Sequence, residues 1–162
     1  MPSLIIMRHA KAVDRTEDGD DFERGLAERG HQDADRAAEA MKAAGLSASH
    51  ALVSPARRTA QTFEHVKSVL GEPPAESPMA LYHASDSMLE RAVLEALAKG
   101  HQRLVLVGHN PGIGAFAHTL ADRADARDGL PWGWPTSAAI AFELEGADLS
   151  APTRTFFFNP KA

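Results

Sequence analysis

The feature of this sequence that most limits its possible folds is the alternation of short apolar runs with longer segments of helical character. Residues 3–8 form a continuous apolar run that ends in the charged pair Arg8-His9. Residues 103–107 form another, which stops at Gly108. Uninterrupted apolar runs of this length are typical of strands buried on both faces.

The remaining segments continue the alternation. Helices are predicted over 26–44, from Ser54-Pro55 to about Leu70, over 86–99, and from Pro111 onward. Further strands are predicted over 50–53, over 137–144 and over 153–158, with a weak one near 79–82. Loops are predicted over 14–25, 71–78 and 128–135. Strand and helix thus alternate four times, and two strands follow. This order predicts an α/β fold, a three-layer α/β/α arrangement with a mostly parallel, mixed sheet of about six strands.

Length and composition restrict the classes of protein that this chain can belong to. With 162 residues and ordinary apolar content, residues 1–162 are expected to form a single domain. The chain has no cysteine, which excludes disulfides, thiolate catalysis and cysteine-ligated zinc. A net charge of −5 and the lack of a long basic run argue against nucleic acid as a partner. No apolar run is long enough to span a membrane and no secretory signal begins the chain, so a cytoplasmic protein without membrane partners is expected.

Polar residues stand where three of the predicted strands end. Arg8-His9 ends the first strand, and His109-Asn110 follows Gly108 at the end of another. Ser54 ends the strand over 50–53, with Arg57 one turn into the helix that follows. Because the carboxyl ends of parallel strands meet at one edge of a sheet, we expect these side chains to gather there.

Two histidines and two arginines at one site favour a phosphoryl group as the substrate group. Arginine presents a rigid fork of donors to phosphate oxygens, and phosphoryl transfer needs mainly positioning and stabilisation of negative charge. Without cysteine, histidine is the remaining good nucleophile, and nearby arginines would keep His9 neutral. His109 would donate a hydrogen bond to an oxygen of the group in transfer.

Five segments, in order along nearly the whole chain, resemble the histidine phosphatase superfamily. This is the phosphoglycerate mutase-like group with an Arg-His-Gly signature, and the small SixA-like phosphohistidine phosphatases are the nearest likeness. The segments are Leu4-Ile5-Ile6-Met7-Arg8-His9-Ala10-Lys11-Ala12, Asp21-Phe22-Glu23-Arg24-Gly25-Leu26-Ala27-Glu28-Arg29-Gly30, Val53-Ser54-Pro55-Ala56-Arg57-Arg58-Thr59-Ala60-Gln61-Thr62, Leu81-Tyr82-His83-Ala84-Ser85 and Val105-Leu106-Val107-Gly108-His109-Asn110-Pro111-Gly112.

The resemblance implies a phosphoglycerate mutase-like fold and roles for particular residues. It implies a catalytic core of Arg8, His9, Arg57 and His109, in which His9 is the nucleophile that carries a covalent phosphoryl group. Residues that would line the site or bind substrate are Ser54, Asn110, Arg24, Lys11 and His83. No cofactor and no metal are expected, and the partner would be a phosphorylated protein or a small phosphorylated molecule.

One catalytic residue of the larger relatives, their proton donor, has no evident counterpart in this chain. They carry an acidic residue after the third strand that protonates the leaving group, but residues 80–86 contain no glutamate. His83 or Asp86 could substitute, or no acid is needed because a phosphohistidine imidazole can depart already protonated. The spacing also leaves no room for a helical subdomain that would roof the site. Both features favour phosphohistidine on a protein as the substrate.

Three other functions are consistent with parts of the pattern. A phosphatase of small phosphate esters would share every core residue, whereas a mutase would need a roof over the site. A non-catalytic phosphate-binding module would not need both His9 and His109. A metallohydrolase would place two arginines beside a dication, at an electrostatic cost, and the chain has no HExxH-like spacing.

Simple structural roles are expected for several other polar and aromatic residues. Arg58 is expected to be a solvated helix residue, and Trp132 and Trp134 are expected to pack under their loop. Histidines expected at the surface or satisfied within helices are His31, His50, His65, His101 and His118. The acidic residues expected to form a solvated loop are Glu17, Asp18, Asp20 and Asp21, without the spacing of an EF-hand.

Overall fold

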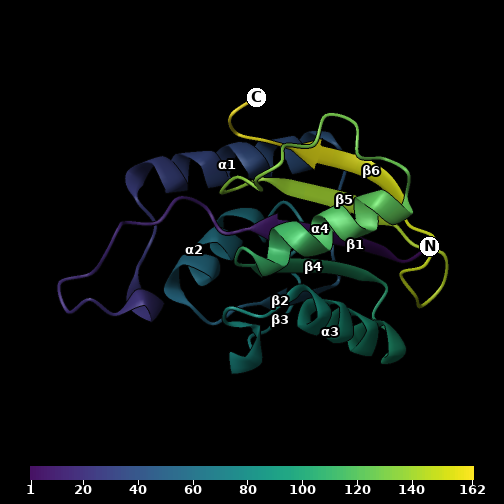
Figure 1. Cartoon of the computed structure of the whole chain (residues 1–162), viewed down its shortest axis with the longest axis horizontal. Coiled ribbons are helices and arrows are strands. Elements are labelled where there is room, and N and C mark those ends of the chain that lie inside the picture. Colours follow the sequence, from purple (N-terminus) through teal and green to yellow (C-terminus); the bar gives the residue numbers. More distant parts are fainter.

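The computed structural model describes all residues, 1–162, and its strands form one six-stranded sheet (Figure 1). The strand order is β3-β2-β4-β1-β5-β6. The strands are β1 (Ser3–Arg8), β2 (His50–Val53), β3 (Ala75–Glu76), β4 (Arg103–Gly108), β5 (Ala139–Glu143) and β6 (Thr153–Phe158). The expected α/β fold with a mixed sheet of about six strands is therefore confirmed.

The pairing of the central strands brings their carboxyl ends together. β1, β2, β3 and β4 run parallel, whereas β5 and β6 are antiparallel to their neighbours. In the pair β1–β4, Arg8 lies opposite Gly108, and in the pair β2–β4, Val53 lies opposite Val107. The residues that follow these three strands must therefore leave the sheet at the same edge.

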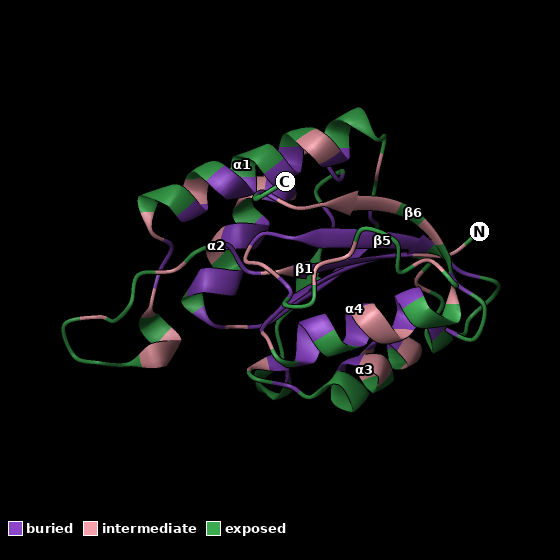
Figure 2. Cartoon of the chain, turned by 45° about the horizontal axis from the view of Figure 1, so that its top comes forward, coloured by how far each residue is buried: buried purple, intermediate pink, exposed green.

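Two pairs of helices cover the two faces of the sheet. The helices are α1 (Glu28–Ala43), α2 (Arg57–Val66), α3 (Asp86–Ala98) and α4 (Gly112–Arg123), with two 3-10 helices, η1 (Asp21–Glu23) and η2 (Met79–Leu81). Leu4 and Ile6 of β1 pack in the core with α3 and α4, whereas Ile5 and Met7 pack in the core with α1 and α2. This alternation explains the continuous apolar run, because successive side chains of a strand point to opposite faces and here both faces are buried (Figure 2).

The third parallel strand was predicted at the wrong position, and the helix predicted from Ser54-Pro55 to about Leu70 is shorter, Arg57–Val66. The weak strand expected near 79–82 is wrong: Met79–Leu81 form η2 instead. The third parallel strand is β3, inside the segment 71–78 that was predicted to be a loop. β3 is two residues long, exposed and at the edge of the sheet, so it has no hydrophobic pattern. It is held to β2 by backbone pairing and by the contact of the Glu76 carboxylate with His50 Nε2 at 2.9 Å.

Ser54 does not cap the helix that follows it. α2 begins at Arg57, and its N-cap residue Ala56 makes no side-chain capping bond. The Ser54 hydroxyl is buried and lies against His109 instead. A tertiary contact therefore takes the side chain that local preference would have used as a cap.

Of the two tryptophans in the loop before β5, one is buried and the other is exposed to solvent. Trp134 is buried, and its Nε1–H donates to the Ala138 carbonyl at 3.1 Å, so the packing role expected for it is confirmed. The same expectation is wrong for Trp132, which is 92% exposed. Trp132 lies in an irregular segment of the loop and faces solvent, so its ring is not used in the core.

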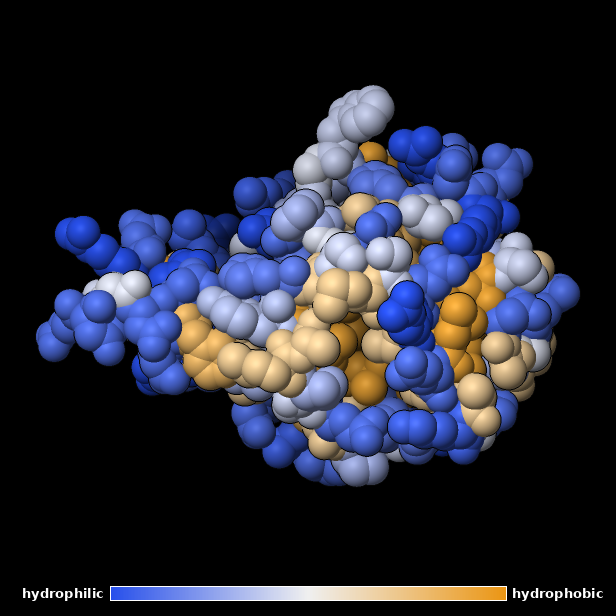
Figure 3. Space-filling view, turned by 60° about the horizontal axis from the view of Figure 1, so that its bottom comes forward, coloured by the Kyte–Doolittle hydropathy of each residue, from blue (hydrophilic) through white to orange (hydrophobic).

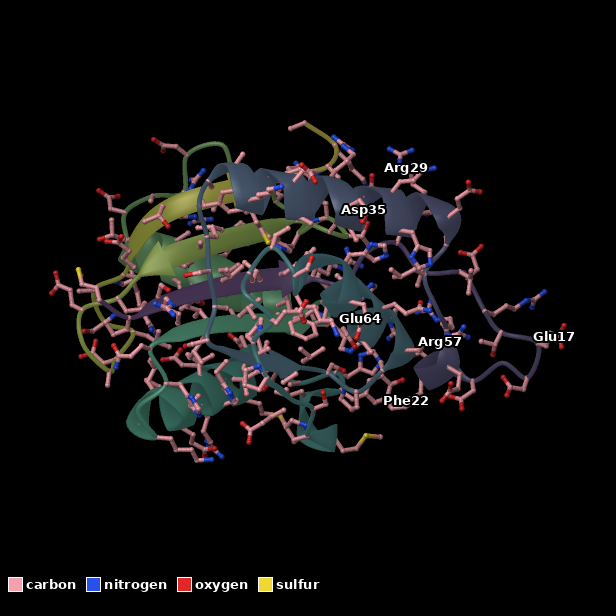
Figure 4. All side chains as sticks on the ribbon, turned by 180° about the vertical axis from the view of Figure 1, so that it is seen from behind. Glu17, Phe22, Arg29, Asp35, Arg57 and Glu64 are labelled. Carbon is pink, nitrogen blue, oxygen red and sulfur yellow. The ribbon has the colours of Figure 1, made fainter.

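Hydrophilic residues cover the part of the chain that projects from the domain. In Figure 3, which shows the side of α3 and β3, the projecting end is largely hydrophilic and apolar patches lie nearer the middle of the face. Glu17 lies at the tip of this projection (Figure 4). No helix in the structure has both the length and the apolar character needed to cross a membrane.

Candidate active site

A cavity of about 270 Å³ opens at the carboxyl edge of β1 and β4, where the sequence predicted a site. The side chains around it are cationic or imidazole groups with small polar neighbours, and no carboxylate is among them. The lining residues are Arg8, His9, Lys11, Ala12, Arg24, Arg58, His83, His109, Asn110 and Thr136. A site with this lining suits a small anion.

His9 follows β1 directly and is held in one orientation by the backbone. Its ring is buried, and Nδ1 lies 2.7 Å from the Ala10 carbonyl oxygen. Since a carbonyl only accepts, Nδ1 carries the hydrogen and Nε2 keeps its lone pair. His9 thus has the tautomer of a nucleophile that attacks through Nε2.

The surroundings of His9 keep this ring uncharged. Burial, together with the positive charges of Arg8, Arg58 and Arg24, lowers the pKa of His9 to about 4, against the opposing effect of the Ala10 hydrogen bond. A neutral ring at physiological pH follows.

Arg8 is fixed at the end of β1, beside His9. Its Nη1 donates to the Trp134 carbonyl at 2.8 Å, and its Nε is buried without a hydrogen-bond partner. Burial and the charge of Arg58 lower the pKa of Arg8 from its usual value. The buried Trp134 therefore positions Arg8 through its backbone.

His109, at the end of β4, faces His9 across the cavity. The two ring centroids are 5.4 Å apart. His109 Nε2 lies 2.7 Å from the Ser54 hydroxyl, and Nδ1 is buried without a partner. Burial, together with the charge of Arg58 and the neighbouring His9 and His83, lowers the pKa of His109 to about 3.

The second arginine of the cavity is Arg58, and the prediction of Arg57 is wrong. Arg58 is 1% exposed and lines the cavity, so the expectation that it is solvated is also wrong. Arg57 is exposed and packs against Gly25 instead (Figure 4). Adjacent helix residues point about 100° apart, so only one of the two can face the cavity.

A helical pattern in the sequence would have identified the correct arginine. The buried side of α2 contains Arg58, Thr62 and Val66, each four residues after the one before. Side chains at this spacing share one face of a helix. Extending the apolar face of Val66 backward leads to Arg58 and not to Arg57.

Asp21 connects the segments around the cavity, and the expectation that it is a solvated loop residue is wrong. Its carboxylate accepts from Arg24 Nε at 2.9 Å, from Arg58 Nη2 at 3.0 Å and from the Tyr82 hydroxyl, and it lies 3.2 Å from His83 Nε2. The hydrogen bond from Tyr82, helped by those from Arg24 and His83 and by the charge of Arg58, holds the pKa of Asp21 well below its usual range. Asp21 is therefore ionised at physiological pH.

Sequence reasoning missed Asp21 because most of its partners are far away along the chain. Arg58, Tyr82 and His83 follow it by 37, 61 and 62 residues. No local spacing indicates such contacts. The only local signal is Arg24, three residues after Asp21.

The other predicted residues divide between the cavity and its surroundings. Lys11, Arg24, His83 and Asn110 line the cavity. Asn110 is also bound at both ends of its amide, since Nδ2 donates to the Trp134 carbonyl and Oδ1 accepts from the Gly114 amide. Ser54 does not line the cavity but supports His109 from behind.

Asp86, considered as a proton donor, does not line the cavity. It is the first residue of α3, and its carboxylate accepts from the Ser87 amide at 2.9 Å. No group of three or more histidine, aspartate or glutamate side chains is arranged to hold a metal ion.

The unpaired donors around the cavity indicate which group fits there. Arg8 Nε, Arg58 Nε and His109 Nδ1 are buried without partners, and all three belong to lining residues. Buried polar atoms are normally hydrogen-bonded, so unpaired ones at a cavity point to a ligand. A tetrahedral oxyanion has enough oxygens to accept from all three side chains.

The sequence and the fold both match known histidine phosphatases. Residues 4–81 match the histidine phosphatase superfamily (branch 1). An uncharacterized protein from Picosynechococcus sp. is 32% identical over 123 residues, which cover 73% of this chain and 72% of that protein.

Solved structures of similar fold include phosphatases with different substrates. A candidate SixA phosphohistidine phosphatase from Agrobacterium tumefaciens has a TM-score of 0.84 at 24% identity over 98% of this chain and 99% of that one. The protein histidine phosphatase SixA, complexed with tungstate, has a TM-score of 0.79 at 23% identity over 98% and 97%. A mycobacterial glucosyl-3-phosphoglycerate phosphatase, in complex with inorganic phosphate, has a TM-score of 0.64 at 15% identity over 98% and 96%.

The segment that matches the family contains part of the site. The matched residues 4–81 contain Arg8, His9 and Arg58, three of the groups that surround the cavity. The fold likenesses extend over the rest of the chain, including β4, which His109 follows. The chain therefore belongs to the histidine phosphatase superfamily and is a phosphatase.

Proposed function

We propose that this protein is a phosphohistidine phosphatase that acts on phosphorylated proteins through a covalent phosphohistidine on His9. One observation carries the proposal: a neutral His9, with Nδ1 held by the Ala10 carbonyl, lies among unpaired arginine donors in a cavity without carboxylates. A nucleophile with a free lone pair beside donors for negative charge is what phosphoryl transfer requires.

The proposed reaction has two steps. Nε2 of His9 attacks phosphorus, a bond between phosphorus and His9 forms, and the bond to the leaving nitrogen of the substrate breaks. Water then attacks the phosphorus, the bond to His9 breaks, and inorganic phosphate and a proton are released. Arg8 and Arg58 stabilise the oxygens of the transferred group, and His109 donates to one of them.

The remaining lining residues have supporting roles in this proposal. Lys11 and Arg24 add positive charge to the cavity, and Asn110 also lines it. Ser54 orients His109 by its contact with Nε2. Arg57, which packs outside the cavity, has no role.

Two observations favour phosphohistidine over a phosphate ester. No carboxylate lines the cavity to protonate an alkoxide, whereas an imidazole can depart already protonated. The structures that match at the highest TM-scores given above are named for SixA phosphohistidine phosphatases.

A phosphatase of small phosphate esters is the second candidate. Structures named for glucosyl-3-phosphoglycerate phosphatase and ecdysone phosphate phosphatase share the fold, at 15% identity each. The arginines and His9 would serve both substrates, so the choice depends on how well each leaving group departs.

Rapid-quench labelling tests the nucleophile. A protein phosphorylated on histidine with phosphoramidate is mixed with the phosphatase, and acid-labile label is sought on His9. We expect label in the native chain, none in His9→Ala, and normal label in His31→Ala, a change at a histidine that does not line the cavity. If His9→Ala turns over substrate as fast as the native chain, the proposal is refuted and another nucleophile is favoured. If the native chain binds phosphate but shows no turnover, a non-catalytic module is favoured.

A comparison of substrates tests the substrate class. The same phosphorylated protein and p-nitrophenyl phosphate are compared by kcat/KM. We expect the protein to be preferred by at least about tenfold, a difference of about 1.4 kcal/mol in transition-state stabilisation. A preference for the ester would instead support the second candidate.

We also propose that the protein is located in the cytoplasm. It is supported by the cysteine-free sequence, because secreted proteins often rely on disulfides. Fractionation of cells that express the tagged chain would test it, and recovery with secreted proteins would contradict it.

A further inference from the structure

His83 is the one imidazole side chain of the cavity lining that is open to solvent. Its side chain is 52% exposed, whereas His9 and His109 are buried. Its ring centroid lies 4.9 Å from that of His109, so it stands at the entrance to the reacting groups. Its Nε2 is 3.2 Å from the Asp21 carboxylate, and its Nδ1 makes no hydrogen bond.

The backbone holds His83 in an unusual conformation. Its φ is +57°, in the left-handed region that side chains other than glycine seldom adopt. Such conformations persist only where the surroundings enforce them, and they cluster at functional sites. Here η2 precedes the residue and the capped start of α3 follows it, since Ser85 Oγ accepts from the Met88 amide.

Asp21 is held in place to orient the His83 ring. Its carboxylate is ionised and fixed by Arg58, Arg24 and Tyr82, so it does not need His83 to balance its charge. Since a carboxylate accepts, Nε2 of His83 carries the hydrogen and Nδ1 keeps a lone pair. A carboxylate behind an imidazole also stabilises the imidazolium that forms when the free nitrogen takes a proton.

The other lining residues cannot take this proton. Arginine and lysine are already protonated, and asparagine, threonine and alanine do not exchange protons usefully near neutral pH. His9 carries the phosphoryl group during hydrolysis. His109 donates from Nδ1 to an oxygen of that group while its Nε2 lies against the Ser54 hydroxyl, so neither ring has a free lone pair. His83 therefore remains as the base for the water that attacks phosphorus.

We infer that His83 is a catalytic residue, the general base for hydrolysis of the phosphohistidine on His9, and that Asp21 is its positioning residue. This inference rests on the proposed function. As water attacks phosphorus, one of its protons moves to Nδ1 of His83, the bond between phosphorus and His9 breaks, and phosphate leaves. The proton then passes from His83 to solvent, through its exposed side.

The inference predicts a separation between the two steps of the reaction. With a phosphohistidine donor the first step needs no proton from the enzyme, so loss of His83 slows only hydrolysis. In His83→Gln, we expect the rate of label transfer to His9 to stay within about threefold of the native rate. We expect hydrolysis of the label to fall about 10²-fold or more, so that phosphorylated His9 accumulates.

The measurement is a rapid-quench time course with the histidine-phosphorylated protein used above. His101→Gln, a change at a histidine outside the cavity, is the matched control and should behave as the native chain. Equal slowing of transfer and hydrolysis in His83→Gln would overturn the inference, and so would unchanged hydrolysis. Absence of label in the native chain would instead refute the nucleophile on His9, which separates the two failures.

Chemical rescue distinguishes a catalytic base from a residue with only a structural role. The open position of His83 allows a small base to reach the site. In His83→Ala, added imidazole should restore hydrolysis of the label in proportion to its concentration, without changing transfer. Failure of rescue, with the label still formed, would overturn the role as a base.

Asp21→Asn tests the positioning residue. Because Asp21 also fixes Arg58 and Arg24, we expect a raised KM in addition to slower hydrolysis. Added to His83→Gln, the same change should slow hydrolysis by less than threefold more, since the base it orients is already gone. A fully multiplicative loss in the double variant would show that Asp21 acts apart from His83.

Discussion

At the scale of single residues, the charge state of the site depends on burial and on neighbouring cations. His9 and His109 are uncharged because burial penalises their charged forms and Arg58 repels a further positive charge. Asp21 is charged because hydrogen bonds stabilise its carboxylate. A neutral His9 and a set of fixed cations therefore coexist within one small cavity.

The choice between two adjacent arginines is testable at this scale. Arg58→Ala removes a buried donor from the cavity and should lower kcat/KM by about 10²- to 10³-fold. Arg57→Ala, on the exposed side of α2, should leave kcat/KM within about threefold. Both values are measured with the histidine-phosphorylated protein, with circular dichroism to verify folding. Equal losses in the two variants would contradict the assignment.

The titration of His9 is a second prediction for single residues. Burial and the neighbouring arginines lower the pKa of His9 to about 4, so the ring should stay neutral as the pH falls through 6.5. The NMR shifts of its ring protons should therefore change with a midpoint near pH 4. In Arg58→Ala the midpoint should move upward, because one repelling charge is gone. A midpoint near 6.5 in the native chain would be evidence against the neutral nucleophile.

At the scale of elements, the ends of the strands and helices carry the site. β1 delivers Arg8 and His9, β4 delivers His109, and the first turn of α2 delivers Arg58. The start of α4 lies directly against the segment that carries His83, since a methyl group on Gly112 would overlap the Ala84 carbonyl. Only glycine permits this approach, so α4 sets the position of that segment.

Gly112→Ala tests the contact between α4 and the His83 segment. We expect a loss of about 1–3 kcal/mol in the free energy of unfolding, because the added methyl group must displace backbone. We also expect slower hydrolysis of the phosphorylated His9. Gly133→Ala is the control, since nothing lies within 4 Å of the added methyl group, and its effect should be within about 0.5 kcal/mol. Urea unfolding measures both, and a harmless Gly112→Ala would contradict the close contact.

At the scale of the whole molecule, one sheet with two cores holds the site at its edge. The core with α3 and α4 supports His83 and His109, and the core with α1 and α2 supports Arg58. The burial of His9 and His109 where the two cores meet lowers the free energy of unfolding at acid pH, because the unfolded chain binds protons that the folded chain does not.

The assignment of residues 1–162 to one domain stays a prediction, and a single protease-resistant core would support it.

The acid sensitivity of the fold follows from the two buried histidines. Their pKa values are about 4 and 3 in the folded chain against an ordinary value of 6.5, so stability is complete above pH 6.5 and falls as the pH drops toward 4. Between pH 7 and pH 4.5 the loss should be on the order of 5 kcal/mol, about half of it from each histidine. Urea unfolding at pH 7 and pH 4.5 measures it. The double variant His9→Gln, His109→Gln should lose less between these pH values, and an equal loss would contradict this origin.

The sequence by itself determined the parts of this protein that depend on local pattern. Continuous apolar runs are sufficient to predict the central strands, because only strands buried on both faces need them. Once the strands are known to be parallel, Arg8, His9 and His109 must meet at one edge. The fold class and the position of the cavity follow from these two steps.

Only the tertiary structure decided which side chains complete the site. Arg58, and not Arg57, reaches the cavity because Arg58 shares the buried face of α2 with Thr62 and Val66. Their four-residue spacing marks this face in the sequence, and the packing of α2 turns it toward the cavity. Asp21 joined the site because it meets Arg58 and His83, which lie far away along the chain. Such contacts depend on how distant segments pack, and no local pattern of residues contains that information.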